Sequence, residues 1–362
     1  MKLYVNFKKY QVTVALGIFI LGMLVLIFFP KEVRNGGTNG GFLCIQVLIP
    51  SLFPFMVLTD FFTLSGLGAK TPKFAGVLTR YLFKLPKEAG AVILLSLLGG
   101  YPVGAKGIKS LHTQGLISDK QAEQMAMFCV ASGPGFLVTY LGVVIIGNIK
   151  IGYFLLISQV ITVLTLGIIS GLFTKTDKTN TMTAVRQEAK TTDLGDAFVM
   201  SVVSGIKSLA GLCGLVILFG GICEVFICIT KGNPVLTPLV SLLEITMGTK
   251  IMSSHYPPYL VSFFCGFGGL CVHLQIFMQL KGIEFSKSLF FLFRILQGVL
   301  SALITLMLTT LFPSAVEVFS NSSSSEPKFY SSAAGCFLLI LCSGIFLIII
   351  QNMGCKNRHF RR

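Results

Sequence analysis

Long apolar runs recur throughout this chain, the first at Val12–Phe29 and the last at Ser332–Ile350. A helix of about 20 apolar residues is long enough to cross the hydrocarbon core of a bilayer. In that medium every backbone polar group needs an internal partner, which a helix supplies. Hydrophobic residues make up 53% of the chain and charged residues only 12%. The sequence therefore predicts an all-α polytopic membrane protein in a lipid bilayer.

One apolar run, Leu94–Lys106 (LLSLLGGYPVGAK), begins like a membrane helix and is then interrupted. Glycine permits non-helical backbone and proline lacks an N–H donor, so the helix should break here. Inside a membrane, broken backbone is tolerated only within protein or beside a water-filled cavity. We interpret this stretch as half of a transport site, with the candidates Gly99, Gly100, Tyr101, Pro102, Gly104 and Lys106.

A weaker copy of this stretch lies in the second half of the chain, at Leu242–Lys250 (LLEITMGTK). At one constant offset, Leu98, Gly100, Gly104 and Lys106 align with Leu242, Glu244, Gly248 and Lys250. Two shorter blocks also match between the halves, Ile49–Leu52 with Ile206–Leu209 and Phe128–Gly133 with Phe264–Gly269, but at other offsets. The chain therefore looks like two related halves with loops of different length.

The charges predict how the chain crosses the membrane. Basic residues favour the cytoplasmic side, which assigns three segments to it: 68–88, 174–196 and 281–288. The Ser-rich, acidic segment 313–331 is then external. All four placements hold if the broken segments 89–108 and 234–252 are re-entrant and enter from opposite faces. About eight helices then cross the membrane, both termini are cytoplasmic, and the halves form an inverted repeat, as in many transporters.

This topology divides the chain into six parts: an N-terminal transmembrane helix and glycine-rich link at 1–40, a first repeat at 41–173, a cytoplasmic linker at 174–197, a second repeat at 198–312, an external loop at 313–331, and a C-terminal transmembrane helix with a basic tail at 332–362. Pro50 and Pro54 should kink the helix that contains them. Ser118 and Gln121 fit a capping box at a helix start. His273 fits a hydrogen-bonded core residue better than a ligand.

Further candidate binding residues lie near other helix breaks: Ser132, Gly133, Pro134, Gly135, Glu244, Thr246, Gly248, Lys250, Gly268, Gly269 and Gln275. We expect the tips of the two re-entrant segments to meet near the membrane centre, so that Tyr101 and Thr246 share a cavity. Each lysine either faces the substrate or extends to the lipid headgroups. Glu244 has three alternative roles: pairing with a lysine, carrying a proton, or capping the broken helix.

The runs SLLGGYPVGAK, IPSLFPFMVL, GLISDKQAEQ and SGPGFL, with LLEITMG and GFGGLCVHLQ in the second half, resemble the YlbJ-type sporulation integral membrane proteins of the nucleoside-recognition (Gate) superfamily. The resemblance covers roughly residues 40–310. It implies a fold similar to concentrative nucleoside transporters. It also implies a role in endospore formation, moving dipicolinic acid from the mother cell across the outer forespore membrane.

Dipicolinate is a small aromatic dianion. Lys106 and Lys250 could each face one of its carboxylates, and Tyr101 could stack on the ring or donate a hydrogen bond. The alternatives are a carrier of nucleosides or another small solute, for which the lysines are not needed, and a non-transporting scaffold in spore assembly, for which two opposed breaks are not needed.

Neither an enzyme nor a nucleic-acid-binding protein is indicated. The sequence contains no HExxH, Walker A or Gly-x-Ser-x-Gly pattern, and it suggests no cofactor and no metal. The net charge of +15 is explained by loop lysines and arginines that orient the protein. The sequence leaves open the coupling ion, cleavage of the first helix, and whether the protein forms a homo-oligomer.

Overall fold

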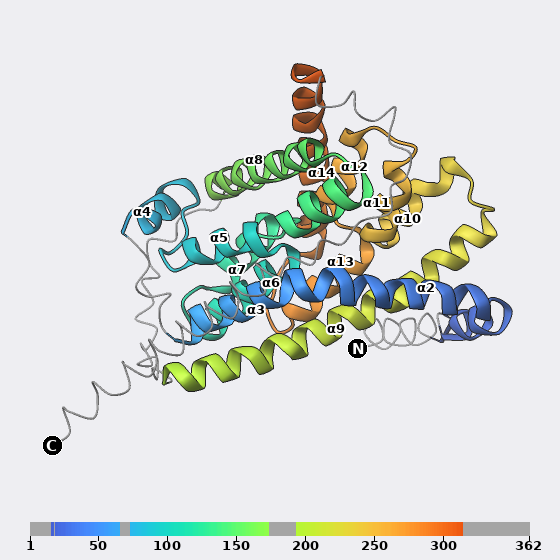
Figure 1. Ribbon diagram of the computed structural model, residues 1–362. Coiled ribbons are helices and arrows are strands. Elements are labelled where there is room, and N and C mark those ends of the chain that lie inside the picture. The colour runs from blue at the N-terminus through green and yellow to red at the C-terminus, as the bar shows by residue number, and fades with distance from the viewer. Residues whose placement is uncertain (1–15, 18, 66–72, 174–192, 314–362) are drawn as a thin grey trace, which may run out of the picture.

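The structure, a computed structural model, describes residues 16–17, 19–65, 73–173 and 193–313, and these ranges are dominated by helices (Figure 1). After a short apolar helix at Phe19–Phe28, the first half contains α2 (Pro30–Leu43), η1 (Cys44–Leu48), α3 (Ile49–Leu64), α4 (Lys73–Leu82), α5 (Ala89–Gly99), α6 (Tyr101–Thr113), α7 (Asp119–Phe128), η3 (Gly135–Ile145) and α8 (Ile149–Phe173). The second half contains α9 (Leu194–Ile229), η4 (Pro234–Leu236), α10 (Thr237–Leu243), α11 (Ile245–Ser253), α12 (Pro258–Phe267), α13 (Gly269–Gln279) and α14 (Lys287–Leu311).

Apart from α4 in the first half and the short η4 in the second, the two halves carry similar elements in the same order. Each has a long helix, then two short helices joined at a single residue, then a helix interrupted in its middle, and finally a helix of 25 residues. The predicted breaks account for this order, because α5 ends at Gly99 and α10 ends at Leu243.

Four helices are long and apolar enough to cross a membrane among the residues that the structure describes: α8, α9, the interrupted pair α12–α13, and α14. A fifth span results if the bent helix from Pro30 to Leu64 is counted as one. The protein is therefore a multi-pass membrane protein. The segments 1–15, 174–192 and 314–362, with the predicted linker, external loop and C-terminal helix, lie outside the described residues.

The expected link at 35–41 is instead helical, which corrects the prediction for the N-terminal region. These residues belong to α2, which packs along α9 (Figure 1). A Cβ at Gly36 would overlap the carbonyl of Gly220, and one at Gly40 would lie 3.0 Å from the carbonyl oxygen of Val216. The glycines therefore allow two helices to approach closely, as small residues do in membranes. The sequence-based prediction considered their flexibility and not this packing.

The helix formed by α2, η1 and α3 bends by 57° between Leu48 and Leu52. The bend lies beside Pro50, as predicted, and follows the π-helical turn η1. Both features are usual causes of a kink. The predicted capping box is also confirmed, because the Ser118 hydroxyl accepts from the backbone N–H of Gln121 and the Gln121 side chain accepts in return.

Polar side chains tie α8, α12 and α14 together inside the bundle. The Ser262 and Ser301 hydroxyls lie 2.6 Å apart, and Gln159 donates to Ser301 at 2.8 Å. Gln297 donates to the Gln159 side-chain oxygen at 3.2 Å. All these side chains are buried. Hydrogen bonds of this kind contribute to helix association in membranes, where apolar surface gives no preference for protein over lipid.

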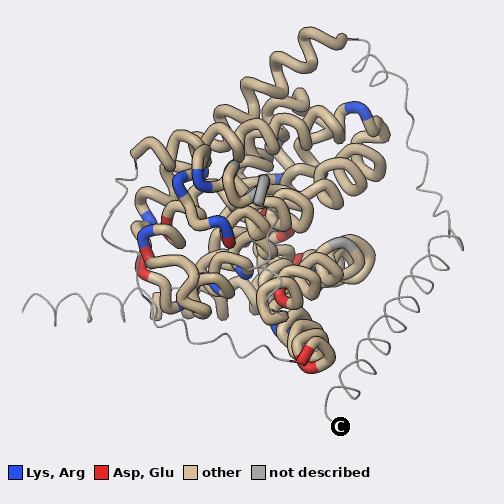
Figure 2. The backbone as a smooth tube through the Cα atoms, turned by 90° about the vertical axis from the view of Figure 1, so that its left-hand side faces the viewer, with Lys and Arg blue, Asp and Glu red and all other residues tan. Residues whose placement is uncertain are grey.

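The segment 281–288, which the charge pattern assigned to the cytoplasmic side, contacts α6 and α7. Lys109, near the end of α6, donates to the carbonyl of Lys281 at 2.8 Å, and Glu123 of α7 accepts from the backbone of Ser286 at 2.8 Å. Figure 2 shows a cluster of charged positions on one side of the bundle. These contacts bring charged residues of α6 and α7 beside the segment 281–286.

Candidate functional site

The helices α5 and α6 form a tight hairpin, called hairpin 1 below, whose tip is Gly100. Gly100 has φ 83° and ψ −167°, a backbone conformation that favours glycine. Below the tip, Ser96 lies against Gly104 and Val92 against Gly107, so the two arms run antiparallel. Gly104 also contacts the carbonyl of Cys129 so closely that a Cβ would overlap it. The glycines of this hairpin therefore serve close packing as well as the turn.

The helices α10 and α11 form a second hairpin, hairpin 2, whose tip is Glu244. Its carboxylate caps α11, accepting from the backbone N–H of Thr246 at 3.0 Å and of Met247 at 2.7 Å. The Thr246 hydroxyl adds a third bond at 2.9 Å. Gly248 packs against Ser241 of the first arm. Of the three roles considered for Glu244, the structure shows helix capping.

The two tips lie at one buried cavity of about 50 Å³. Its lining includes Gly100, Tyr101, Pro102, Gly133, Glu244, Thr246 and Gln275. The prediction that Tyr101 and Thr246 share a cavity is therefore confirmed. A volume of this size holds a few water molecules but not an aromatic dianion.

The interrupted helix α7–η3 passes directly behind hairpin 1. Between Phe128 and Gly135 the chain is largely unwound, and this segment is called the unwound segment below. Ser132 donates to the Tyr101 hydroxyl at 2.5 Å, and the Tyr101 hydroxyl donates to the carbonyl of Cys265 on α12. Gly133 faces Gly100, where a Cβ on Gly133 would lie 2.9 Å from the Gly100 nitrogen. Tyr101 therefore joins the two halves of the chain and has its hydroxyl engaged.

The second interrupted helix breaks between α12 and α13. Gly268 and Gly269 both have positive φ, 96° and 71°. Gly268 lies beside the Tyr101 ring, and Gly269 lies against the carbonyl of Ser241 in hairpin 2. His273 is buried and its Nε2 lies 2.8 Å from the carbonyl oxygen of Phe267, so the prediction of a hydrogen-bonded core histidine is confirmed.

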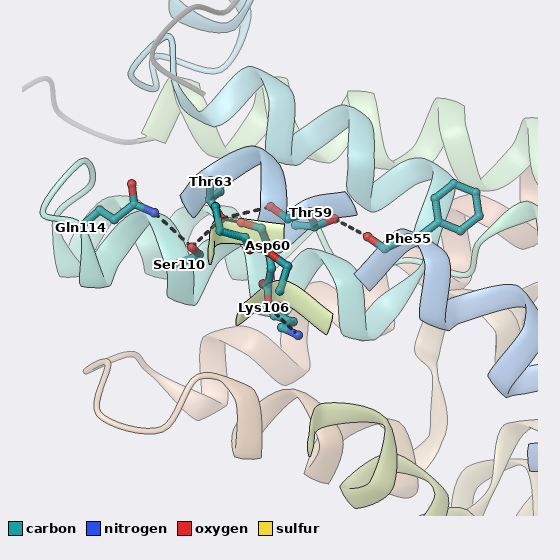
Figure 3. A network of polar contacts seen from close by, with 9 residues as sticks. Phe55, Thr59, Asp60, Thr63, Lys106, Ser110 and Gln114 are labelled. Atoms are coloured by element: carbon teal, nitrogen blue, oxygen red, sulfur yellow. Dashed lines mark hydrogen bonds and ion pairs between the residues drawn. The ribbon is translucent and has the colours of Figure 1, made fainter. Parts of the chain in front are cut away.

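Lys106 is buried and paired, which neither sequence-based alternative described. Its Nζ lies 2.8 Å from Oδ2 of Asp60 on α3, and both side chains are 7% exposed. Figure 3 shows this pair beside a chain of hydroxyls, in which Ser110 donates to Thr63 at 2.8 Å. Lys106 therefore does not extend to the headgroups. It does not line the buried cavity at the hairpin tips, nor a second, wider cavity that is lined by Lys250.

Lys250 has the opposite environment. It is exposed and lines a wide cavity of about 810 Å³ between α2, η3, α9 and α11, a cavity that also includes Gly135. Exposed Phe42 and Thr139 at its wall show that the cavity opens at the surface of the bundle. Val47 lines both cavities, which places the buried one at the inner end of the wide one.

A pair of aromatic side chains extends from the buried cavity to the wide one. The rings of Phe136 and Tyr140 are stacked, with centroids 5.6 Å apart and an interplanar angle of 23°. Phe136 lines the buried cavity and Tyr140 the wide one. An apolar wall therefore runs from the hairpin tips toward Lys250, although no sequence pattern had marked Phe136 or Tyr140.

Helix ends meet at this centre in a definite arrangement. The second arm of each interrupted element begins there: α6, η3, α11 and α13. A helix start carries free N–H groups and a partial positive charge. Glu244 neutralises the start of α11, whereas α6, η3 and α13 have no side-chain cap. The centre can therefore offer backbone donors to an anionic group.

Two charged residues of this region were missed at the level of sequence, Asp60 and Arg294. Both interrupt apolar runs, VLTDFFTL and FFLFRILQG. An ionisable residue within a predicted span marks a functional position by default, and applying that rule to every span would have found them. Of the remaining candidates, Pro134 lies directly before η3, and Gly99 ends α5 and lies against Val103.

These features define a multi-pass helical membrane protein with a buried polar centre between two helical hairpins. Comparison with known proteins agrees with this class. The chain is 26% identical over 346 residues to the sporulation integral membrane protein YlbJ of Bacillus subtilis (strain 168), and the alignment covers 84% of each chain. No family model and no solved structure matches the chain.

Proposed function

We propose that this protein carries a small organic anion across the membrane and that the anion is dipicolinate, moved during spore formation. The observation that carries the proposal is the meeting of the two hairpin tips at one buried cavity, at the inner end of a wide cavity that opens at the surface. Binding sites of transporters are typically formed where interrupted helices meet near the membrane centre.

We infer that the two hairpins enter from opposite faces, because their open ends lie at opposite ends of α9. Phe198, near its start, contacts Phe61, which lies near the open end of hairpin 1. Thr230, directly after its end, lines a recess with Ile251, which lies near the open end of hairpin 2. These two positions on α9 are separated by roughly 48 Å at 1.5 Å per residue. The halves therefore fit an inverted repeat with two re-entrant hairpins.

An anion suits the centre better than a neutral solute does. Three helix starts there lack a side-chain cap, while several helix-end carbonyls already have donors, from Tyr101, His273 and Arg294. Lys250 adds a full positive charge at the wide cavity, and no ion pair of Lys250 is recorded within the described ranges. The centre itself therefore offers mostly donors to a ligand, whereas the wide cavity presents both Lys250 and the carboxylate of Glu224.

An aromatic anion fits the wall formed by Phe136 and Tyr140. A pyridine ring can lie against these side chains while its carboxylates reach donors, in a cavity whose volume is typical of small-molecule sites. The buried cavity is too small for such a ring, so we infer that the tips separate as the solute passes. The name of the relative connects that protein with sporulation, and the resemblance of the hairpin 1 sequence supplies dipicolinate and the outer forespore membrane.

Uptake of labelled dipicolinate into proteoliposomes, with and without sodium or proton gradients, tests the proposal. Lys250→Met should reduce dipicolinate uptake about fivefold at low substrate concentration, because one attraction of about 1 kcal/mol is lost. Lys250→Arg should retain uptake, and Lys150→Met is the matched control, since Lys150 is exposed and lines neither cavity.

The alternatives predict different results. A nucleoside carrier would take up uridine and be indifferent to Lys250→Met. A scaffold would take up neither solute, and spores that lack the protein but still make dipicolinate would contain normal amounts of it. Either result would reject the proposal.

A further inference from the structure

The unwound segment behind hairpin 1 is the part of the site whose backbone depends most on hydrogen bonds from other elements. Phe128 to Ser132 are at most 2% exposed. Their backbone carbonyls are therefore removed from water, and outside a helix they lack the regular partners that a helix supplies. A group from another element must therefore donate hydrogen bonds to these carbonyls.

Arg294 of α14 supplies that group. It is fully buried, its Nη2 donates to the carbonyl of Met127 at 2.5 Å, and its Nη1 donates to the carbonyl of Val130. The guanidinium carbon lies 5.3 Å from the centroid of the Phe290 ring. The planar fork of an arginine thus joins the last turn of α7 to the first residues beyond it, a geometry that a lysine cannot reproduce.

No carboxylate accounts for the burial of this charge. Within the described part of the chain the buried acids are Asp60, which pairs with Lys106, and Glu244, which caps α11. The positive charge is held instead by carbonyls at the negative end of α7 and by an aromatic face. Burying a guanidinium in this way carries a large desolvation penalty, so an apolar residue would serve mere packing better.

The geometry points to Arg294 as a positioning residue for the central site. By fixing Val130, it sets the direction of the next residues, so that Ser132 reaches the Tyr101 hydroxyl and Gly133 reaches Gly100. These contacts shape one wall of the buried cavity. The bridge also runs from the second half of the chain to the first, while Tyr101 makes the converse connection to Cys265. The consequence for transport rests on the proposed function, whereas the support of the unwound segment does not.

Cys129 is a natural probe of this support, because it lies within the unwound segment and is fully buried. The experiment compares the wild type with Arg294→Lys and Arg294→Met in proteoliposomes, using maleimide labelling of Cys129 measured by peptide mass spectrometry and dipicolinate uptake kinetics. Arg80→Lys is the matched control, since Arg80 is exposed on α4.

For Arg294→Lys we expect labelling of Cys129 to be about tenfold faster and KM for dipicolinate to rise about tenfold with Vmax within about twofold, since one charge-assisted bond of two is lost. Arg294→Met should show a larger effect or fail to fold. Unchanged labelling in Arg294→Lys would overturn the inference, and so would faster labelling with unchanged KM. If the wild type does not take up dipicolinate, the proposed function fails, and the labelling comparison still decides whether Arg294 holds the segment.

Discussion

The two hairpins have the same construction and opposite charge arrangements. Each consists of two short antiparallel helices, with a glycine four residues after the tip packed against a neighbour and a lysine two residues later. In hairpin 1 the tip is uncharged Gly100 and Lys106 is buried against Asp60. In hairpin 2 the tip is Glu244 and Lys250 is exposed at the wide cavity.

The difference depends on the helix that packs behind each hairpin. Asp60 lies on α3, beside hairpin 1. The offset that aligns Ile49 with Ile206 places Ile217 of α9 at the position of Asp60, so hairpin 2 has no equivalent acid. The lysine at the corresponding position is therefore buried in an ion pair in one half and exposed at a cavity in the other.

The largest expected effect comes from breaking the buried pair of hairpin 1. Lys106→Met should lower the free energy of unfolding by about 3–5 kcal/mol, because the Asp60 carboxylate would remain buried without its partner. Lys250→Met should leave stability unchanged within about 0.5 kcal/mol. Denaturant titration in detergent micelles measures both.

A double variant separates lost pairing from lost packing at this position. Asp60→Asn with Lys106→Met removes both charges and should recover most of the stability lost in Lys106→Met alone. Equal destabilisation by Lys106→Met and Lys250→Met would show that the two lysines are equivalent and would remove the distinction between the hairpins.

The next effect concerns the close contact between hairpin 1 and the unwound segment. Gly104→Ala should destabilise the protein by about 1–3 kcal/mol, because the new methyl group would overlap the backbone carbonyl of Cys129, which cannot rotate away. Gly214→Ala in α9 is the control, since no atom lies within 4 Å of a Cβ placed there. Thermal unfolding in detergent compares them, and a stable Gly104→Ala protein would contradict the packing described here.

A smaller loss of stability should come from a change at the tip of hairpin 2. Glu244→Gln keeps the shape of the cap but cannot accept at both positions, so stability should fall by about 1 kcal/mol. Removal of a negative charge beside the cavity should also strengthen binding of the dianion, by about tenfold at most. Equilibrium binding of dipicolinate to purified protein measures this change, and weaker binding by Glu244→Gln would indicate that the carboxylate assists the substrate.

Much of the local structure was predictable because helix breaks depend on nearby residues. The breaks at Gly100, Glu244 and Gly268 follow from glycines, prolines and a capping acid within a few positions. The capping box at Ser118 is local in the same way. The convergence of the tips at one cavity was also predicted, from the two matching breaks in the two halves of the chain.

The glycine-rich part of α2 was predicted wrongly for a complementary reason. Flexibility is a local property of glycine, but Gly36 and Gly40 are used here for contact with α9, which follows nearly two hundred residues later. Composition alone could not distinguish a flexible link from a close helix crossing.

The sequence by itself determined that this is a helical membrane protein and where its helices break, since hydropathy and backbone preferences act over short distances. Only the tertiary structure decided which polar groups are already engaged. Lys106 meets Asp60, Arg294 meets the carbonyl groups of Met127 and Val130, and Lys250 remains at a cavity. The physical reason is that a buried charge is stabilised by partners brought together from distant parts of the chain, and no local pattern specifies which partner arrives.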